Sequence, residues 1–559
     1  MRVSGVLLLG FSLVGCSSAA SPVSPDVDAS EHHDASTPHV DAASPRHDAG
    51  GTKPPPHHDA AIDAAPDVGF LEPTATLPPL ASAPITTAET LVPVHALVSP
   101  PDPGPPSTPS VLSSWLAEGY GQTTLGAGQP LLPVSPPGAT VPPVGANPTM
   151  LLRFVHLPDI QLADDESPNR ACDLDVPAVS GATDGAFRPQ EGDECRILDA
   201  AIRTINTLNT TLPISFVLTG GDNADNAQTN EIDWFLQIMD GASSVKCDSG
   251  DYNDPVKGPN NDGKDPFDAV GLDVPWWWVT GNHDVNIQGT FPVDATSQAR
   301  ALGTKPLSKT RDYTKPGAPL FAGPVVPDAR RAALTRPDLM KLVAADGDGH
   351  GVSASQVSSG KAFYSFDVTG TPLRFIILDT PAETGGVEAV IHQADITGTI
   401  KPLFDQALSD GKLVITASHH STDEVNDGSG FGGVQQADAL TETEWEDFLG
   451  GYDNLLFSMV GHLHLHRVTY VTPATGHAFW EVMTGALADY PHQFRLVEIW
   501  DDDNGWIRMR AIVTDYQTEN DPVAAAGRTL AIADQTSGWA LDGYGADTDR
   551  NIELYIEKP

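Results

Sequence analysis

One short stretch of the chain joins a buried strand to a polar turn: residues 274–284 read VPWWWVTGNHD. The apolar run over 274–280 predicts a strand that is buried on both faces. The Gly281-Asn282-His283-Asp284 turn that follows places an amide, an imidazole and a carboxylate at the strand's carboxyl end. A single polar residue at a strand end is usually a turn or a helix cap, so this pattern indicates function only if it recurs.

The pattern recurs after four other apolar runs, which cover residues 151–157, 214–219, 413–417 and 455–460. Their polar ends are, in chain order, Asp159-Ile160-Gln161, Gly220-Gly221-Asp222-Asn223, His419-His420 and Gly461-His462-Leu463-His464. Open α/β sheets gather their ligand sites at the carboxyl ends of the strands. We therefore expect the five strand ends to converge on one site.

The segments between these strands are typical of an α/β protein. Apolar residues recur at helical spacing over 195–208 and 232–239. This order of elements predicts a mixed, largely buried sheet covered by helices. Residues 479–485 and 496–500 indicate further strands that complete a second sheet, whereas the Asp- and Gly-rich segment 248–268 is predicted to be a surface insertion.

The strand-end side chains offer oxygen and imidazole ligands without a thiolate. Such ligands suit Mn, Fe or Zn, and two ions need about seven or eight ligand contacts with one bridging carboxylate. Glycines beside Asp222, Asn282 and His462 let the backbone turn sharply and bring these side chains close to the ions. The sequence therefore predicts a dinuclear centre with two divalent or mixed-valent metal ions as cofactors.

The Gly-Asn-His-Asp and Gly-His-x-His motifs, in this order and each after a predicted strand, resemble those of the calcineurin-like metallophosphoesterase superfamily. This superfamily includes purple acid phosphatases and bacterial phosphodiesterases. The resemblance implies a four-layer α/β/β/α sandwich of two mixed β-sheets flanked by helices. It also implies hydrolysis of a phosphoester, monoester or diester, by a hydroxide that bridges the two metal ions. The alternative function is a non-catalytic envelope protein that keeps the fold for binding.

The resemblance also implies a role for each strand-end residue. The implied metal ligands are Asp159 and His464 at the first ion, Asp222 as the bridge, and Asn282, His419 and His462 at the second ion. His420 stands beside His419 as a competing candidate. His283 is not a ligand in this scheme; it stabilises the phosphoryl oxygens or protonates the leaving oxygen, and Asp284 orients its imidazole.

Gln161 departs from the superfamily's pattern. Many members carry Asp-x-His in the first motif, whereas this chain has Asp159-Ile160-Gln161. Gln161 can bind the first ion through its amide oxygen, act through a water, or hydrogen-bond a neighbouring ligand. Because an amide oxygen suits harder ions than an imidazole does, we expect the first site to favour Fe or Mn over Zn.

Residues 1–16 are predicted to be a lipoprotein signal peptide. Arg2 precedes an apolar run over 6–14 that is too short to span a bilayer, and residues 13–16 read LVGC, which resembles the bacterial lipobox. This resemblance implies lipidation of Cys16 and a lipid-anchored protein of the cell envelope, at the outer membrane or the periplasmic face. An ordinary secretory signal with a chance cysteine is the alternative.

Composition divides the remaining chain into three parts. Residues 17–110 are predicted to be a disordered tether rich in Pro, Ala, Asp and His, because they offer too little apolar surface to offset chain entropy. Residues 111–149 are expected to form an extended arm, and residues 150–559 the metallophosphoesterase domain. Beyond Cys16 the chain has Cys172, Cys195 and Cys247, which permit one disulfide; the first two are the closer pair, but the pairing stays open.

The charge balance limits the possible partners. The 559 residues include 31 Lys and Arg against 74 Asp and Glu, which gives a net charge of −43. Such a chain is repelled by phosphate backbones, so nucleic-acid binding through a basic surface is excluded. The expected partners are a phosphoester substrate and, only through the N-terminal lipid, a membrane.

Overall fold

The computed structural model describes residues 73–180, 183 and 185–559. Contacts divide the chain into the units Met1–Ala60 and Ala61–Pro559, and the described residues belong to the second. The predicted signal peptide, Cys16 and the tether up to residue 72 lie outside the described residues. In the described part of the chain, no helix combines the length and the hydropathy that crossing a bilayer requires.

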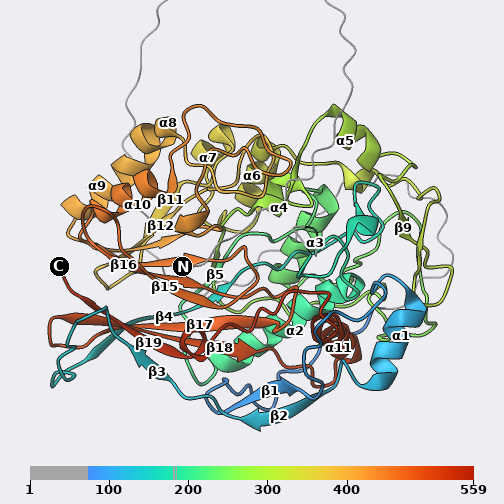
Figure 1. The fold of residues 1–559 in the computed structure, drawn as a ribbon, viewed down its shortest axis with the longest axis horizontal. Coiled ribbons are helices and arrows are strands. Elements are labelled where there is room, and N and C mark those ends of the chain that lie inside the picture. The colour runs from blue at the N-terminus through green and yellow to red at the C-terminus, as the bar shows by residue number, and fades with distance from the viewer. Residues whose placement is uncertain (1–72, 181–182, 184) are drawn as a thin grey trace, which may run out of the picture. The chain divides into compact units, whose positions relative to one another are not determined.

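A seven-stranded mixed sheet forms one central layer of the fold (Figure 1). Its strands lie in the order β3 (Leu132–Val134), β19 (Ile552–Glu557), β18 (Trp506–Asp515), β17 (Gln493–Asp501), β4 (Thr149–Leu157), β5 (Val217–Thr219) and β6 (Trp276–Trp277). β4, β5 and β6 are parallel, and β17 pairs antiparallel with the other edge of β4. The three parallel strands therefore end at one edge of the sheet.

A six-stranded mixed sheet forms the second central layer. Its strands lie in the order β11 (Tyr364–Asp367), β12 (Leu373–Ile377), β13 (Leu413–Ala417), β14 (Leu455–Val460), β16 (Phe479–Met483) and β15 (Arg467–Val471). The four inner strands are parallel, and the two edge strands are antiparallel to their neighbours. Every residue of β13 and β14 is buried, as expected for parallel strands that are covered on both faces.

The two sheets pack face to face through aromatic side chains. The Phe154 ring of β4 meets the Phe375 ring of β12 edge-on, with ring centroids 5.4 Å apart, and Phe216 meets Phe375 at 5.5 Å. These rings belong to one apolar core that joins both sheets. The predicted α/β class, with two mixed sheets flanked by helices, is confirmed.

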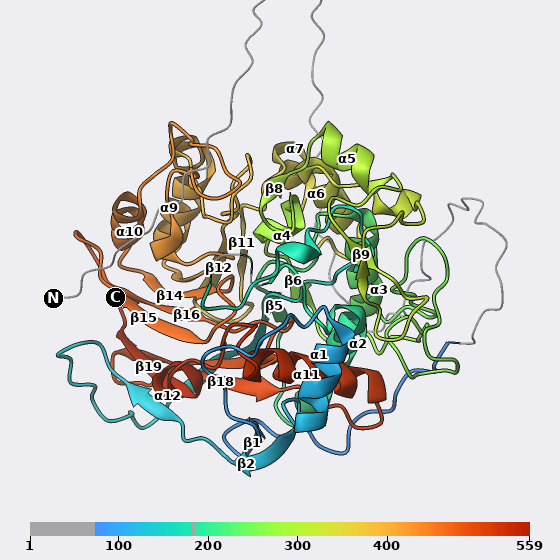
Figure 2. The ribbon, with the colours of Figure 1, turned by 45° about the vertical axis from the view of Figure 1, so that its right-hand side comes forward.

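Helices cover the outer sides of the two sheets. The longer ones are α1 (Pro109–Glu118), α2 (Glu194–Asn209), α3 (Thr229–Asp240), α6 (Arg336–Ala345), α9 (Lys401–Ser409), α10 (Glu442–Gly450) and α11 (Pro522–Thr536). Figures 1 and 2 show α2 and α11 against the seven-stranded sheet, and α9 and α10 beyond the six-stranded sheet. The shorter ones are α4 (Asn282–Val285), α5 (Ala295–Ala301), α7 (Ala354–Ser359), α8 (Gln393–Asp395) and α12 (Asp547–Arg550).

The predicted helices and strands occur with small shifts of their ends. The helical spacing over 195–208 corresponds to α2, whose buried residues include Ile197, Leu198 and Ile205. The predicted strand over 274–280 is shorter, because the ladder of β6 ends at Trp277. Two residues beyond this end, Val279 N donates to the side-chain hydroxyl of Thr219 at 3.1 Å and not to a backbone carbonyl of a neighbouring strand.

The last predicted strand belongs to the other sheet. Residues 479–485 correspond to β16 in the six-stranded sheet, but residues 496–500 lie in β17, which pairs with β4 and β18 in the seven-stranded sheet. The assignment of both segments to the second sheet is therefore wrong for β17. One edge of β4 is occupied by β5, and β17 satisfies the backbone groups of the other edge.

Residues 73–149, which were predicted to belong to the tether and the arm, include regular elements. β1 (Glu89–Pro93) and β2 (Thr123–Ala127) form an antiparallel pair, and β3 joins the seven-stranded sheet beside β19. Trp115 of α1 packs in a small apolar cluster with Tyr120 and Trp539. Thr86 Oγ1 donates to Val513 O at 2.6 Å, which fastens the start of this segment to β18.

Further small strands are paired as β7 (Asn286–Ile287) with β8 (Phe291–Pro292) and β9 (Thr310–Arg311) with β10 (Leu320–Phe321). The disulfide joins Cys195 to Cys247, and Cys172 is a buried free thiol. The pair closer in sequence is therefore not the bonded one, because α2 and the segment after α3 lie next to each other.

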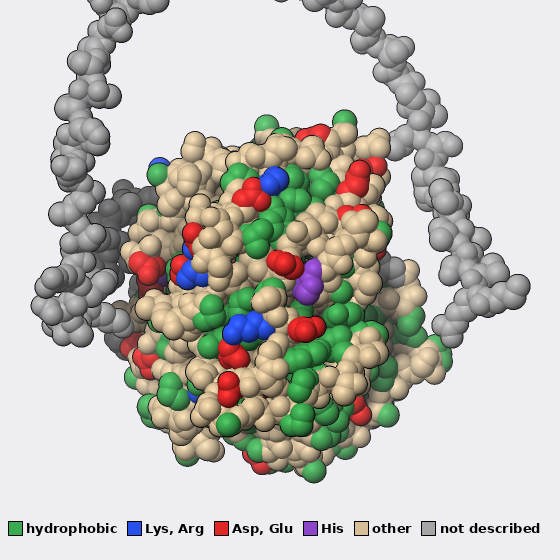
Figure 3. Space-filling view, turned by 90° about the vertical axis from the view of Figure 1, so that its left-hand side faces the viewer, with side chains coloured by type: hydrophobic (Ala, Val, Ile, Leu, Met, Phe, Trp, Pro, Cys, Tyr) green, Lys and Arg blue, Asp and Glu red, His purple; other side chains and the backbone are tan. Residues whose placement is uncertain are grey.

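On the face in Figure 3, Lys and Arg side chains stand among acidic ones and do not gather into a broad patch.

Candidate metal centre

Side chains from the ends of both sheets meet at one place. Asp159 and Gln161 follow β4, Asp222 follows β5, Asn282 begins α4 after β6, His419 follows β13, and His462 and His464 follow β14. The chain turns abruptly here, since φ is +53° at Asp159, +54° at Asp222 and +77° at His462. Residues other than glycine rarely adopt these left-handed conformations, and such strain concentrates at functional sites.

Asp222 and His419 form a close contact between the ends of the two sheets. His419 Nδ1 donates to Gly220 O at 2.8 Å, and its Nε2 lies 3.0 Å from Asp222 Oδ2. Burial alone would lower the pKa of His419, but the Asp222 carboxylate outweighs burial and raises this pKa to about 9. A proton on Nε2 satisfies this contact when no metal ion is bound, and because Gly220 fixes Nδ1, Nε2 is the nitrogen that can bind a metal ion once that proton leaves.

Asp159 and His464 form a second pair of this kind. His464 Nδ1 donates to Asp489 Oδ2 at 2.6 Å, and its Nε2 lies 3.4 Å from Asp159 Oδ1. Burial opposes the charged imidazole, yet the hydrogen bonds to Asp159 and Asp489 raise the pKa of His464 to about 10. His464 is thus held by one carboxylate and turned toward another, which is the usual arrangement of a metal-bound histidine.

His462 completes the set of imidazoles. Its Nε2 lies 3.2 Å from Glu424 Oε1, to which it donates, and its Nδ1 lies 3.3 Å from His419 Nε2. Each of the three imidazoles therefore donates its outer N–H to an acceptor and turns the other nitrogen toward the centre.

Two buried amide oxygens fit the same centre. Asn282 Nδ2 donates to Gly289 O at 3.0 Å, and Gln161 Nε2 lies 3.4 Å from Asp222 Oδ2. The oxygens of both amides are buried and have no hydrogen-bond donor. A buried acceptor without a donor is costly unless a cation binds it, so the residues present fit a pair of metal ions.

Glycine is required where the backbone passes close to the carboxylates. A Cβ at Gly281 would lie 2.1 Å from Asp222 Oδ1, and one at Gly461 would lie 2.6 Å from Asp159 Oδ2. Any side chain at these two positions would displace a candidate ligand.

His420 groups with His419 and His462 as a possible set of metal ligands, but both of its ring nitrogens have other partners in the structure. Its Nε2 donates to Val387 O at 3.0 Å, and its Nδ1 accepts from the Thr380 hydroxyl at 2.8 Å. Both ring nitrogens are therefore occupied. Burial lowers the pKa of His420 well below its ordinary value, so the ring is neutral. Of the two adjacent histidines, His419 is the one that faces Asp222.

His283 lies beside the centre with one nitrogen free to act. Its Nδ1 donates to Asp225, at 3.0 Å to the backbone oxygen and 3.1 Å to Oδ1, while its Nε2 is 4.0 Å from Asp222 Oδ2. The side chain is 16% exposed. Burial would lower the pKa of His283, but the carboxylates of Asp222 and Asp225 outweigh burial and raise it.

Asp284 does not contact the His283 imidazole, which corrects its expected role. Asp284 Oδ1 accepts from Asn223 N at 2.8 Å and Ala224 N at 3.0 Å, and Oδ2 accepts from Gly281 N at 2.8 Å. The carboxylate points back into the turn because these backbone groups lack other partners. Asp284 therefore fixes the loop after β5, and Asp225 orients His283.

Three further residues help to orient the histidines of the centre, although none of them directly follows a predicted strand in the sequence. Asp489, between β16 and β17, holds His464, and Asp225 holds His283. Arg188 Nε lies 3.0 Å from both Asp489 carboxylate oxygens, and its Nη1 lies 3.8 Å from Asp225 Oδ1. One buried guanidinium therefore links the carboxylates that orient the two histidines. Of the three, only Asp225 lies close to a motif, three residues after Asp222.

Replacing Asp489 by Asn should weaken the first metal site. The amide still accepts a hydrogen bond from His464 but loses the charge that makes the imidazole a stronger ligand, so we expect metal affinity to fall by about 10- to 100-fold. Competition with a chromophoric chelator measures this change. Asp453→Asn, at an exposed position before β14, is the matched control. An unchanged affinity in Asp489→Asn would mean that His464 is positioned without Asp489.

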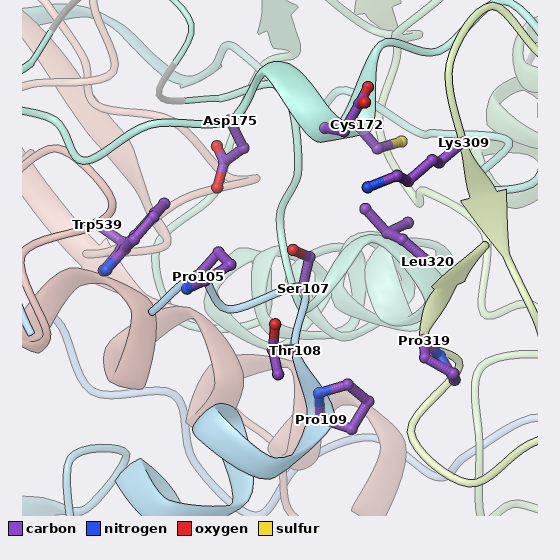
Figure 4. Close-up of a pocket in the computed structure, with 11 residues that line it drawn as sticks. Pro105, Ser107, Thr108, Pro109, Cys172, Asp175, Lys309, Pro319, Leu320 and Trp539 are labelled. Atoms are coloured by element: carbon purple, nitrogen blue, oxygen red, sulfur yellow. The ribbon is translucent and has the colours of Figure 1, made fainter. Parts of the chain in front are cut away.

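A cavity of about 360 Å³ lies apart from these residues. Figure 4 shows the Cys172 sulfur on one wall beside Lys309, with Trp539 on the opposite side. Burial raises the pKa of the Cys172 thiol to about 11, so it is protonated at neutral pH and is a poor nucleophile. None of the candidate ligands lines this cavity.

Comparison with known proteins identifies likenesses only among solved structures. No family model matches the chain, and no curated protein matches it. A dimetal phosphatase from Danio rerio is 12% identical, with 66% of this chain and 100% of that chain covered and a TM-score of 0.34. A purple acid phosphatase from yellow lupin (Lupinus luteus) seeds is 12% identical, with 78% and 56% covered and a TM-score of 0.29. The sulfate thiohydrolase SoxB of Thermus thermophilus is 14% identical, with 70% and 62% covered and a TM-score of 0.27.

Proposed function

We propose that this protein is a metal-dependent hydrolase that cleaves a phosphoester at a centre of two metal ions. The observation that carries the proposal is the convergence of carboxylates and outwardly held imidazoles: His419 Nε2 lies 3.0 Å from Asp222 Oδ2, and His464 Nε2 lies 3.4 Å from Asp159 Oδ1. Each imidazole is held from outside by a hydrogen bond, and the buried oxygens of Asn282 and Gln161 have no donor, which favours a site for cations over a self-contained ion-pair network.

Two ions fit the donors present. The proposed ligands are Asp159, Gln161 and His464 at the first ion, Asp222 between the ions, and Asn282, His419 and His462 at the second. Bound ions would supply an activated water and positive charge for the phosphoryl oxygens. Gln161 is included through its amide oxygen, which has no donor, while its amide nitrogen faces Asp222. Oxygen-rich donors at the first ion favour Fe or Mn over Zn there.

His283 is proposed to supply the proton of the reaction. Asp225 holds its Nδ1–H, so Nε2, which lies 4.0 Å from Asp222 Oδ2, is the nitrogen left to carry the proton of the reaction. The carboxylates of Asp222 and Asp225 outweigh burial and raise the pKa of His283, which favours the protonated imidazole. The imidazolium can hydrogen-bond a phosphoryl oxygen and then protonate the leaving oxygen. A non-catalytic binding protein has no need for this residue beside the ions.

Turnover tests the proposal directly. The purified protein is loaded separately with Mn, Fe and Zn and assayed against phosphate monoesters and diesters, with a sulfate ester and a carboxylate ester as controls. We expect hydrolysis of at least one phosphoester that depends on metal and is lost after chelation. If the protein holds two metal ions per chain and hydrolyses no phosphoester, the non-catalytic binding function replaces this one.

We further propose that a lipid on Cys16 holds the protein on the cell envelope, supported by the LVGC run at residues 13–16. Cys16→Ala should release the protein from the membrane fraction without changing its hydrolytic activity, because the lipid is attached only at that thiol. Fractionation and the mass of the N-terminal peptide measure this, with Ser17→Ala as the control. A soluble wild-type protein whose N-terminus lies beyond Ala20 would contradict it.

A further inference from the structure

The insertion between α3 and β6 is a closed loop. Val245 and Phe267 exchange backbone hydrogen bonds of 2.8 and 3.0 Å at its base. The disulfide from Cys247 to Cys195 ties the first residues of the loop to α2. The loop between these anchors, residues 246–266, is therefore held in place at both ends although it contains no helix or strand.

Three carboxylates gather inside this loop. One oxygen from each of Asp254, Asp262 and Asp265 lies within 4.8 Å of the others. The nearby Lys264 does not neutralise them, because its amine pairs with Asp165 at 2.8 Å, Glu166 at 3.3 Å and Asp248 at 3.4 Å.

Two nearby arginines are also engaged elsewhere. Arg196 Nη2 lies 3.1 Å from Asp521 Oδ1, and Arg330 pairs with Asp328 at 2.6 Å. Across the described ranges, no Lys or Arg forms an ion pair with the three clustered carboxylates. Three negative charges this close repel one another unless a cation compensates them.

Buried oxygens without donors point to a ligand at the cluster. Asp265 is only 1% exposed, and its Oδ1 has no hydrogen-bond donor, while its Oδ2 accepts from Asn261 N at 2.9 Å. Asp254 Oδ1 is likewise buried without a donor, and so is the neutral amide oxygen Asn260 Oδ1 in the same loop. Native proteins seldom leave buried acceptors unpaired, and several in one loop indicate a cation.

The loop also fixes the orientation of the cluster. Asp262 accepts from Lys264 N at 2.9 Å and from Val256 N at 3.0 Å, which folds the loop back on itself. Asn260 adopts φ +57°, a left-handed conformation that reverses the chain just before Asp262. The carboxylates are therefore brought together by backbone geometry, before any cation binds.

We propose that this loop binds one Ca²⁺ through Asp254, Asp262 and Asp265, at a site separate from the candidate metal centre. The donors are all oxygens, with no imidazole or thiolate, which suits a hard cation. Ca²⁺ takes about six to eight oxygen ligands in flexible geometry, so amide oxygens such as that of Asn260 and water can complete its shell. Mg²⁺ fits less well, because it demands near-octahedral geometry and gives up its water reluctantly.

The proposed ion would stabilise the side of the fold next to the metal centre. Asn253 Nδ2 donates to Glu166 Oε2 at 3.0 Å, and Lys264 reaches Asp165, so the loop is fastened to the segment that follows Asp159 and Gln161. A ligand that binds the native state alone raises the unfolding temperature. The expected effect of Ca²⁺ is therefore on stability, and it does not depend on the proposed phosphoesterase activity.

Asp254→Asn is the decisive variant, with calorimetric Ca²⁺ titration and thermal unfolding as readouts. No hydrogen bond or ion pair of Asp254 is present among the described residues, so the amide should leave the fold intact. In EGTA, this variant should unfold at the same or a higher temperature than wild type, since one repulsive charge is gone. With Ca²⁺, wild type should gain stability, and the variant should bind Ca²⁺ at least about 10-fold more weakly and gain less.

Two controls distinguish this site from a general effect of charge and from the candidate metal centre. Asp251→Asn removes an equal charge from an exposed position of the same loop and should bind Ca²⁺ like wild type. Asp222→Asn alters the candidate metal centre and should still bind one Ca²⁺. The proposal is overturned if wild type binds no stoichiometric Ca²⁺ and unfolds at one temperature with Ca²⁺ and with EGTA, or if Asp222→Asn rather than Asp254→Asn abolishes binding.

Discussion

Asp222→Asn should release metal and reduce hydrolysis together, by at least about 10³-fold, because charge stabilisation by the ions is worth several kcal/mol. Asp222 is the proposed bridging carboxylate: Oδ2 faces His419 at 3.0 Å, and Oδ1 accepts from His283 N at 2.8 Å. The amide removes the negative charge and turns either a weaker oxygen or an N–H group toward the ions. Elemental analysis and kcat on the same preparation measure both effects.

The control for Asp222→Asn is Asp453→Asn, which removes a charge from an exposed position. It should keep the wild-type metal content and turnover. Thermal unfolding shows whether each variant is folded. A folded Asp222→Asn protein that retains two metal ions and most of its activity would remove Asp222 from the bridging position.

His283→Ala should keep both metal ions and lower kcat by about 10² to 10⁴-fold, the contribution typical of a general acid. Metal retention is expected because the link from this residue to Asp222 is its backbone N–H, which alanine still provides. The lost group is the imidazole that Asp225 holds and that the neighbouring carboxylates keep protonated.

The leaving group of the substrate gives this variant an internal control. A nitrophenyl phosphoester has a leaving oxygen that needs little protonation, whereas an alkyl phosphoester needs a proton. The loss in His283→Ala should therefore be larger for the alkyl substrate. Loss of metal from His283→Ala would make His283 a ligand, and equal losses for both substrates would limit its role to binding phosphoryl oxygens.

Strand periodicity and the residues just after each strand can be recognised in the sequence. The runs 413–417 and 455–460 coincide with β13 and β14, because parallel strands buried on both faces must be continuously apolar. The polar residues that follow them cannot continue the buried strand. Their position at the carboxyl ends of parallel strands brings them to one edge, which is why the set from Asp159 to His464 is predictable from the sequence.

The partners of these residues are not predictable in this way, because they come from segments without periodic structure. Asp489 reaches His464 only because the chain passes the centre between β16 and β17, and Arg188 lies in the long connection between β4 and α2. The role of Asp284 could not be predicted from its position in the sequence either. Its position beside His283 indicates an orienting role, but an adjacent residue in a tight turn points its side chain away, and Asp225 takes that place.

The α/β class, the strands that end at the centre and the types of ligand there are encoded locally in the sequence, since they follow from periodicity and from residue chemistry. The tertiary structure was needed to show which sheet β17 joins, that Cys195 pairs with Cys247, and that residues 73–149 contribute strands and a helix to the folded unit. The physical reason is that each of these depends on contacts between residues far apart in the chain. Burial of apolar surface and hydrogen bonding in the whole fold determine these contacts. They cannot be read from the residue pattern of any single segment.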